Sequence, residues 1–284
     1  MALRDLVHEL QPNCIVSGRV GHDVGDYGSM GDNQIPLGRV EGDWETPATL
    51  NDTWGYKSDD DNWKTVDTLL YLLVDLASKG VNYLLNVGPT AEGLIPRPSI
   101  ELLEGIGDWM DVNGEAIYGT QASPYPYEFE WGRLTQKGEA LYLLITTWPT
   151  EPLRILGIRN KVRAATLLAS PETAVDMAQQ HDARSASHEV VLGLPGSATD
   201  PCISVLRLDL EGQVDVDDAP QQQADGSVVL PAHMAAKTGS VTVGRSGFSQ
   251  GWNGTDSALS WTFRLREPGN YRIDIYTAGN RHSG

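Results

Sequence analysis

The chain has 284 residues, of which 40% are hydrophobic and 21% are charged, an ordinary composition for a globular protein with room for two domains. Its 21 basic and 38 acidic residues give a net charge of −17, which argues against nucleic acid or an anionic membrane as a partner, because phosphate binding needs basic patches. No apolar run reaches the roughly 18 residues of a membrane span. The two cysteines, Cys14 and Cys202, are predicted to be free thiols, and no residue spacing indicates a metal site.

The chain is expected to open with a helix over residues 2–10, because apolar residues recur there at helical spacing. This start lacks the basic and long apolar regions of a signal peptide and is typical of the middle of a fold. A short apolar strand is predicted at residues 14–17. A loop from about Arg19 to Lys64 follows, and loops of that length inside a compact domain are usually functional.

A second amphipathic helix is predicted over about 65–79, with Thr65 or Asn62 as its cap and Gly80 at its end. Residues 82–87 form a nearly continuous apolar stretch, which is typical of a strand buried on both faces of a parallel sheet.

A third helix is expected from about residue 100 to Asn113. The strands at 13–18 and 82–87 are predicted to be adjacent and parallel, joined by the helix at about 65–79. So few βα units cannot bury both faces of their strands. This region is therefore expected to be part of a larger α/β sheet or the end of a (β/α)8 barrel.

The pattern changes to short alternating strands after residue 120. We expect residues 1–120 to be the α/β part and 121–212 to be an antiparallel β-sandwich. A polar, acidic linker is predicted at 213–227, and a truncated β-sandwich at 228–284 that is a candidate for carbohydrate binding. The strands expected in these regions are 140–148, 162–168, 190–194, 203–208, 259–265 and 271–275.

Five short sequence blocks occur in one order in the first part of the chain. They are Gly42-Asp-Trp-Glu-Thr46, Asn51-Asp-Thr-Trp-Gly-Tyr56, Leu73-Val-Asp-Leu-Ala-Ser-Lys-Gly80, Asn82-Tyr-Leu-Leu-Asn-Val-Gly-Pro89 and Asp108-Trp-Met-Asp-Val-Asn-Gly-Glu-Ala-Ile-Tyr-Gly119.

Together these blocks resemble family 29 glycoside hydrolases, the retaining α-L-fucosidases, over about residues 1–150. Val81 departs from the pattern, because the family usually has a second glycine there. The resemblance implies the C-terminal βα units of a (β/α)8 barrel followed by a β-sandwich, with no metal or organic cofactor. It also implies a fucosylated oligosaccharide or glycoconjugate as substrate and a secreted, periplasmic or lysosomal location.

A retaining glycosidase needs two carboxyl groups about 5–5.5 Å apart, one as nucleophile and one as acid/base. By resemblance, the nucleophile is an aspartate in a Trp-Phe-Asp-type motif, and paired histidines grip the sugar; neither feature occurs in this chain. The chain is therefore expected to hold at most the acid/base half of the site. The function implied for the full-length parent is hydrolysis of terminal α-L-fucosyl bonds by double displacement. The alternative is a non-catalytic carbohydrate-binding fragment.

The resemblance points to Asp32, four residues before Pro36, as the acid/base, with Glu45 as the second choice. An ordinary turn residue is the other interpretation of Asp32, and orientation of Arg19 is the other interpretation of Glu45. By resemblance, Arg19 binds the sugar or orients the nucleophile, unless it only pairs with a loop carboxylate. Trp54 is expected to stack on the apolar face of fucose, unless it is a core residue.

Overall fold

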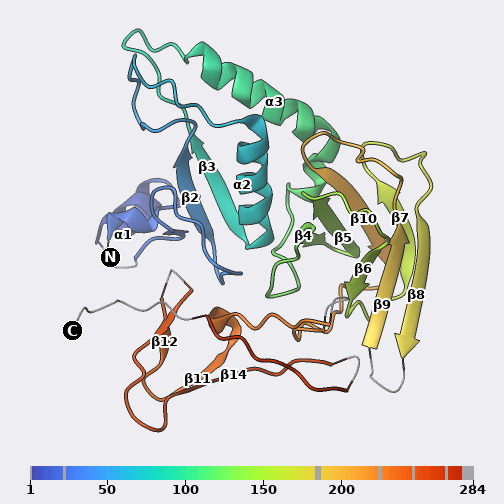
Figure 1. Ribbon diagram of the computed structural model, residues 1–284. Coiled ribbons are helices and arrows are strands. Elements are labelled where there is room, and N and C mark those ends of the chain that lie inside the picture. Colours follow the sequence, from blue (N-terminus) through green and yellow to red (C-terminus); the bar gives the residue numbers. More distant parts are fainter. Residues whose placement is uncertain are drawn as a thin grey trace.

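The computed structural model describes residues 2–21, 24–182, 187–222, 226–244, 247–265 and 268–276. Along the chain, a parallel sheet with helices is followed by two antiparallel sheets and then by a segment of short strand pairs (Figure 1). The chain is therefore a mixed α/β protein with separate antiparallel sheets, as predicted at this level. Within the described ranges, no helix combines the length and apolar character needed to cross a bilayer.

In its described residues, the first part contains three α-helices, two short 3-10 helices and three strands, and the strands all run parallel. The strands lie in the order β1-β2-β3, and α2 connects β2 to β3. The elements are α1 (Ala2–Leu10), η1 (Gly18–Val20), β1 (Gly28–Ser29), β2 (Trp44–Thr49), α2 (Val66–Ser78), β3 (Val81–Asn86), α3 (Arg97–Asn113) and η2 (Gly114–Ala116).

Helix α2 begins and ends where its sequence predicts. The Thr65 hydroxyl accepts a hydrogen bond from the Thr68 N–H at 3.2 Å, which satisfies one of the free donors of the first turn. Gly80 has φ +79°, a left-handed conformation that suits glycine just beyond a helix. The predicted helices at 2–10, 65–79 and 100–113 and the strand at 82–87 are confirmed within a few residues.

The predicted partner of β3 is wrong. Residues 14–17 contribute only a single parallel bridge, between Ser17 and Tyr27, and β2 lies beside β3 instead. Strand β2 falls inside the stretch predicted to be a loop. Its sequence, Trp-Glu-Thr-Pro-Ala-Thr, has no apolar run, yet Thr46 and Thr49 are buried, because their hydroxyls donate to the Gln34 and Asn51 carbonyls.

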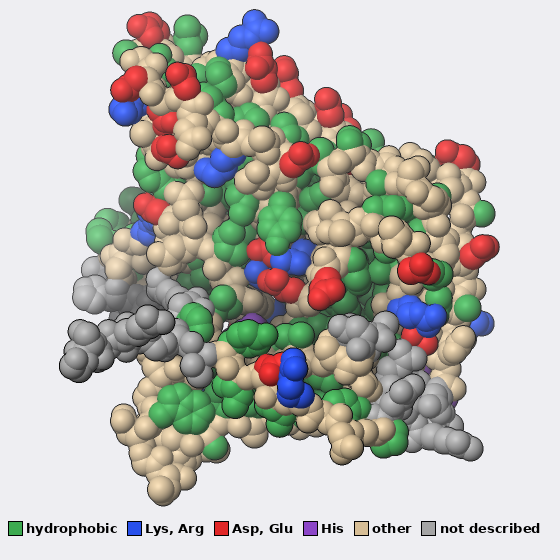
Figure 2. Space-filling model, in the orientation of Figure 1, with side chains coloured by type: hydrophobic (Ala, Val, Ile, Leu, Met, Phe, Trp, Pro, Cys, Tyr) green, Lys and Arg blue, Asp and Glu red, His purple; other side chains and the backbone are tan. Residues whose placement is uncertain are grey.

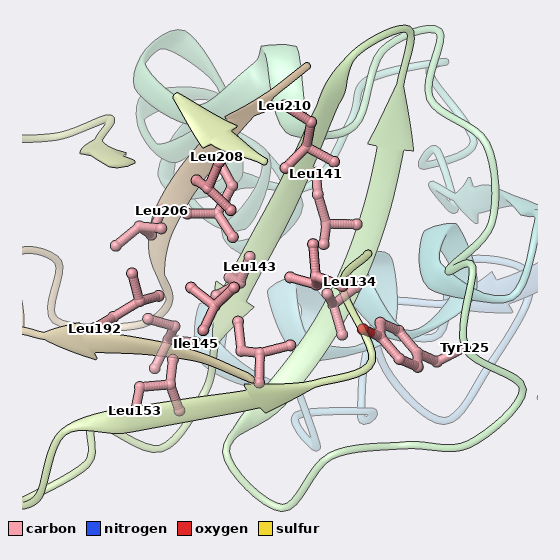
Figure 3. Packing of buried hydrophobic residues seen from close by; sticks show 14 of the residues in the cluster. Tyr125, Leu134, Leu141, Leu143, Ile145, Leu153, Leu192, Leu206, Leu208 and Leu210 are labelled. Carbon is pink, nitrogen blue, oxygen red and sulfur yellow. The ribbon is translucent and has the colours of Figure 1, made fainter. Parts of the chain in front are cut away.

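Two antiparallel sheets follow and share one hydrophobic core. Leucines from β4, β5 and β10 face Leu153 and Leu192 of β6 and β9 (Figure 3). The larger sheet has the order β4-β5-β10-β7 and the smaller one β6-β9-β8. The strands are β4 (Gly132–Lys137), β5 (Ala140–Ile145), β6 (Leu153–Leu156), β7 (Val162–Leu167), β8 (Asp176–Asp182), β9 (Ser187–Gly193) and β10 (Ser204–Leu210).

The larger sheet is covered on both faces. Leu141 and Leu143 of β5 pack into the core between the two antiparallel sheets, whereas Tyr142 and Leu144 pack against Leu70, Val74 and Trp109 of α2 and α3. The Trp109 indole donates to the Ile203 carbonyl at 2.8 Å. A strand covered on both faces needs an apolar run, which explains why β5 was predictable from sequence.

A buried ionic network also joins α2 to the larger sheet. The Asp75 carboxylate accepts hydrogen bonds from Lys79 and Arg133, and Glu128 pairs with the same two cations at 2.8 and 2.7 Å. The Tyr71 hydroxyl accepts from Arg133 at 2.7 Å. Figure 2 shows basic and acidic side chains gathered in a hollow near the middle of one face of the molecule.

In the described residues of the C-terminal segment, the strands form two small pairs. These are β11 (Ala236–Thr238) with β14 (Ala258–Ser260) and β12 (Thr242–Val243) with β13 (Ser249–Gln250), preceded by η3 (Ala232–Met234). The strand predicted at 259–265 extends only to Ser260, and the strand predicted at 271–275 is wrong. Ile273 and Ile275 are about four-fifths exposed, so the alternation of apolar and polar residues was not sufficient to predict a strand here. Gln221 and Gln222, in the predicted linker, are buried.

Candidate functional site

Arg19 lies directly after the Ser17 bridge, at the edge of the parallel sheet. Its side chain crosses β1, where its Nε donates to the Ser29 hydroxyl at 3.1 Å. The guanidinium also forms an ion pair with the Asp32 carboxylate. Both charged side chains are about half exposed, at 52% and 54%, so a ligand can reach them from solvent.

Asp32 is held beside the end of β2 by its neighbour Asn33. The Asn33 N–H donates to the Pro47 carbonyl at 2.8 Å, and its side-chain oxygen accepts from the Thr49 N–H at 3.1 Å. Asn33 has φ +55°, a left-handed conformation that asparagine tolerates better than most residues. The loop that carries Asp32 is thereby fixed to the last three residues of β2.

Glu45 is the second residue of β2, and its Cα is paired with those of Ser29 and Asn82 on the neighbouring strands. The pKa of Arg19 is raised, first by its hydrogen bond to Asp32 and, to a smaller extent, by the charge of Glu45. Arg19, Asp32 and Glu45 therefore share one electrostatic neighbourhood. Glu45 lies four residues before the end of its strand, which corresponds to about 13 Å along the chain.

Trp54 lies in the loop after β2, beside the carboxyl end of β3. Its carbonyl accepts from the Asn86 amide at 2.7 Å. A Cβ at Gly88 would come within 3.1 Å of the same carbonyl, so glycine permits this close approach. The Trp54 side chain is 38% exposed and is therefore not a core residue in this structure.

Asp26 holds the segment that precedes Arg19 and is not itself part of the candidate site. Its carboxylate accepts from the Val16 N–H at 2.8 Å and pairs with His8 at 2.9 Å and with Arg4 at 2.6 Å. The hydrogen bond from Val16 is the largest cause that lowers the pKa of Asp26. This carboxylate fixes α1 and the segment that leads to Arg19.

Sequence reasoning missed Asn33 and Ser29 as members of this site. Asn33 could have been found from the Asp-Asn pair, since asparagine often occupies turn positions with positive φ. Ser29 had no such signal, because a lone serine after glycine is common in loops. Its role is visible only in the fold, where β1 places the Ser29 hydroxyl within hydrogen-bonding distance of Arg19.

In the part of the chain that the structure describes, no group of three or more His, Cys, Asp or Glu side chains is arranged to hold a metal ion. Cys14 and Cys202 form no disulfide and are partly buried, in agreement with the prediction of free thiols. Burial raises the pKa of the Cys202 thiol to about 12, so this group is a poor nucleophile.

The α-L-fucosidase family model matches residues 2–115. The chain is 30% identical to human tissue α-L-fucosidase over 165 residues, which cover 54% of this chain and 34% of that protein. The structure of the α-L-fucosidase from Vibrio sp. strain EJY3 has a TM-score of 0.75 with 28% identity, covering 83% of this chain and 44% of that one. The α-L-fucosidase isoenzyme 1 from Paenibacillus thiaminolyticus has a TM-score of 0.67 with 33% identity, covering 74% and 53%.

The residues matched by the family model include the parallel sheet and the loops that hold Arg19, Asp32, Glu45 and Trp54. The chain spans about a third of the length of the curated relatives it matches. Residues 2–115 therefore match the α-L-fucosidase family, and the chain corresponds to part of the length of that family's members.

Proposed function

We propose that this chain supplies the acid/base half of a retaining α-L-fucosidase active site, on the C-terminal βα units of a (β/α)8 barrel. The nucleophile and the remaining strands come from sequence that this chain does not contain. The observation that carries the proposal is the Arg19–Asp32 ion pair beside the carboxyl end of β2, with Trp54 beside the carboxyl end of the adjacent strand β3. In barrel enzymes this is the edge of the sheet that carries the chemistry.

The proposed reaction cleaves a terminal α-L-fucosyl bond by double displacement. In the first step, the acid protonates the leaving oxygen while the nucleophile attacks the sugar. In the second step, the same residue acts as a base and activates water. Arg19 binds a sugar hydroxyl or orients the nucleophile, and Trp54 covers the apolar face of fucose. Neither step requires a metal or a cofactor.

Asp32 remains the first choice for the acid/base, and the geometry supports it over Glu45. Asn33 places Asp32 level with Pro47 and Thr49 at the carboxyl end of β2. Glu45 lies near the opposite end of the same strand. In this proposal, Glu45 orients Arg19, whose pKa its charge helps to raise.

The first experiment measures activity in the chain alone and after it is joined to the upstream βα units of its own gene. We expect no turnover of an aryl α-L-fucoside by the 284-residue chain, because the nucleophile is missing. The joined protein should hydrolyse it at a rate in the normal enzyme range of about 1–1,000 per second. Activity in that range from the isolated chain would contradict the proposal.

Azide rescue in the joined protein separates the two carboxylates. An aryl fucoside needs little protonation to lose its leaving group, but the second step needs a base. Asp32→Ala should therefore be slow, and added azide should restore turnover with formation of fucosyl azide. Glu45→Ala should not be rescued. The opposite pattern, with Asp32→Ala near wild type, would exchange the two roles.

A second candidate function is carbohydrate binding without catalysis. The exposure of Trp54 favours it. Calorimetric titration of the isolated chain with L-fucose distinguishes the two. Saturable binding that is lost in Trp54→Ala, together with a joined protein that stays inactive, would support this second function.

A further inference from the structure

The β8–β9 hairpin carries two histidines that face each other across the strands. His181 and His188 are directly opposed in the antiparallel register, so their side chains project from the same face of the smaller sheet. Their ring centroids are 4.3 Å apart, and the ring planes are inclined by 31°. This pair lies outside the parallel sheet and takes no part in the proposed fucosidase chemistry.

We propose that His181 and His188 together bind one divalent transition-metal ion of the Cu²⁺, Ni²⁺ or Zn²⁺ class. Imidazole nitrogen is the ligand that these ions prefer among neutral side chains. Two metal–nitrogen bonds of about 2.0–2.1 Å at a tetrahedral angle separate the nitrogens by about 3.4 Å. Rings whose centroids are 4.3 Å apart reach that separation by small side-chain rotations.

Burial is the largest cause that lowers the pKa of His188, and charges of both signs also act on it, where Arg159 lowers the pKa and Asp217 and Asp215 act in the opposite direction. Arg159 is the basic group whose charge reaches His188, and it is itself paired with Asp215 at 2.9 Å. Asp217 also acts on His188 with a negative charge. The strand position is fixed, because the His188 carbonyl accepts from the Gly157 N–H at 2.8 Å.

The site has two protein ligands, since the described residues contain no group of three that could hold a metal. Water completes the coordination, and His181 is exposed, so an ion can enter from solvent without opening the fold. Affinity follows the usual order of these ions and is greatest for Cu²⁺. The ion ties β8 to β9 in the folded state, and it therefore raises the midpoint of thermal unfolding.

The test uses the 284-residue chain without an affinity tag, titrated separately with Cu²⁺, Ni²⁺, Zn²⁺ and, as a control, Mg²⁺. Calorimetry and thermal unfolding are measured for wild type, His181→Asn and His188→Asn. We expect saturable binding of Cu²⁺ and a rise in the unfolding midpoint in wild type, and no response to Mg²⁺. Each variant should bind about tenfold more weakly or worse, because it loses one of two ligands.

The matched control is His8→Gln, which removes a histidine from α1 and should leave metal binding unchanged. Broadening of the His181 and His188 ring proton signals by Cu²⁺ in the wild-type protein gives a readout that does not depend on the variants. Equal binding by wild type and both hairpin variants would overturn the proposal, as would the absence of saturable binding of all three transition-metal ions. Because fucosidase activity is not measured in this test, its outcome is independent of the proposed fucosidase function.

Discussion

Asn33 is the residue on which the position of Asp32 depends. Replacing it with alanine removes the side-chain acceptor of the Thr49 N–H and places at φ +55° a residue that tolerates the left-handed conformation less well than asparagine does. The lost hydrogen bond and the left-handed conformation together should lower the free energy of unfolding by about 2 kcal/mol. Urea unfolding of the isolated chain measures this loss.

Two matched variants at the same position separate the causes. Asn33→Gly keeps the left-handed backbone accessible and loses only the side-chain hydrogen bond, so it should be destabilised less than Asn33→Ala. Asn33→Asp keeps an acceptor for the Thr49 N–H. Equal stability of the glycine and alanine variants would show that the backbone conformation at Asn33 has no energetic weight.

At this scale one contact of the candidate site could be predicted from the sequence and another could not. The pairing of Arg19 with a loop carboxylate was one of the two interpretations of Arg19, and the structure shows it with Asp32. Whether Arg19 also binds a sugar stays a prediction. The contact between Arg19 and Ser29 could not be predicted, because it depends on β1 and β2 being neighbours.

At the scale of elements, the contact between α2 and β4 depends on Asp75. Its side chain is 5% exposed and binds Lys79 and Arg133, which are themselves nearly buried. Among the described residues, Asp75→Ala leaves Glu128 as the carboxylate paired with both cations, and that carboxylate is 44% exposed. We expect a loss of about 3–5 kcal/mol in the free energy of unfolding, because removing one partner leaves buried charge uncompensated.

Glu101→Ala is the matched control for this prediction. It breaks the ion pair between Arg97 and Glu101 on α3, whose side chains are 88% and 58% exposed. An exposed pair four residues apart contributes little to stability, because solvent and salt screen it. Guanidinium unfolding compares the two variants, and similar losses would mean that the network around Asp75 has no special role.

The elements that were predictable are those whose burial is apolar. Helix α2 and strand β5 carry long apolar patterns, and both were located within a few residues. Strand β2 can be buried because the hydroxyl groups of its threonines donate hydrogen bonds to backbone carbonyls. Such hydrogen bonds cannot be predicted from the sequence of one strand alone. Strands β4, β6 and β8 were missed for a related reason, since each is short or partly polar.

At the scale of the whole molecule, the C-terminal segment packs against the first part of the chain. A Cβ at Gly38 would lie 3.2 Å from the His233 ring, so η3 packs against the loop before β2. The Trp261 indole donates to the Pro231 carbonyl at 2.9 Å and holds the chain on both sides of η3 together. The segment therefore depends on contacts with the rest of the chain, because its own strand pairs are too small to be stable alone.

This contact with the first part of the chain should weaken in mild acid. Burial is the largest cause that lowers the pKa of His233, and Lys79 and Lys237 lower it further, whereas Glu128 acts in the opposite direction. The unfolded chain binds a proton at this histidine near pH 6.5, whereas the folded chain binds it only at lower pH. The contribution of neutral His233 to stability is therefore present above pH 6.5 and is lost as the pH falls through the lowered pKa.

Urea unfolding between pH 7 and pH 5 should show a decline in the free energy of unfolding that is smaller in His233→Gln, which has no proton to gain. Limited proteolysis over the same range should cut the C-terminal segment of the wild type sooner at pH 5. If wild type and variant lose stability in parallel, protonation of His233 does not control this contact.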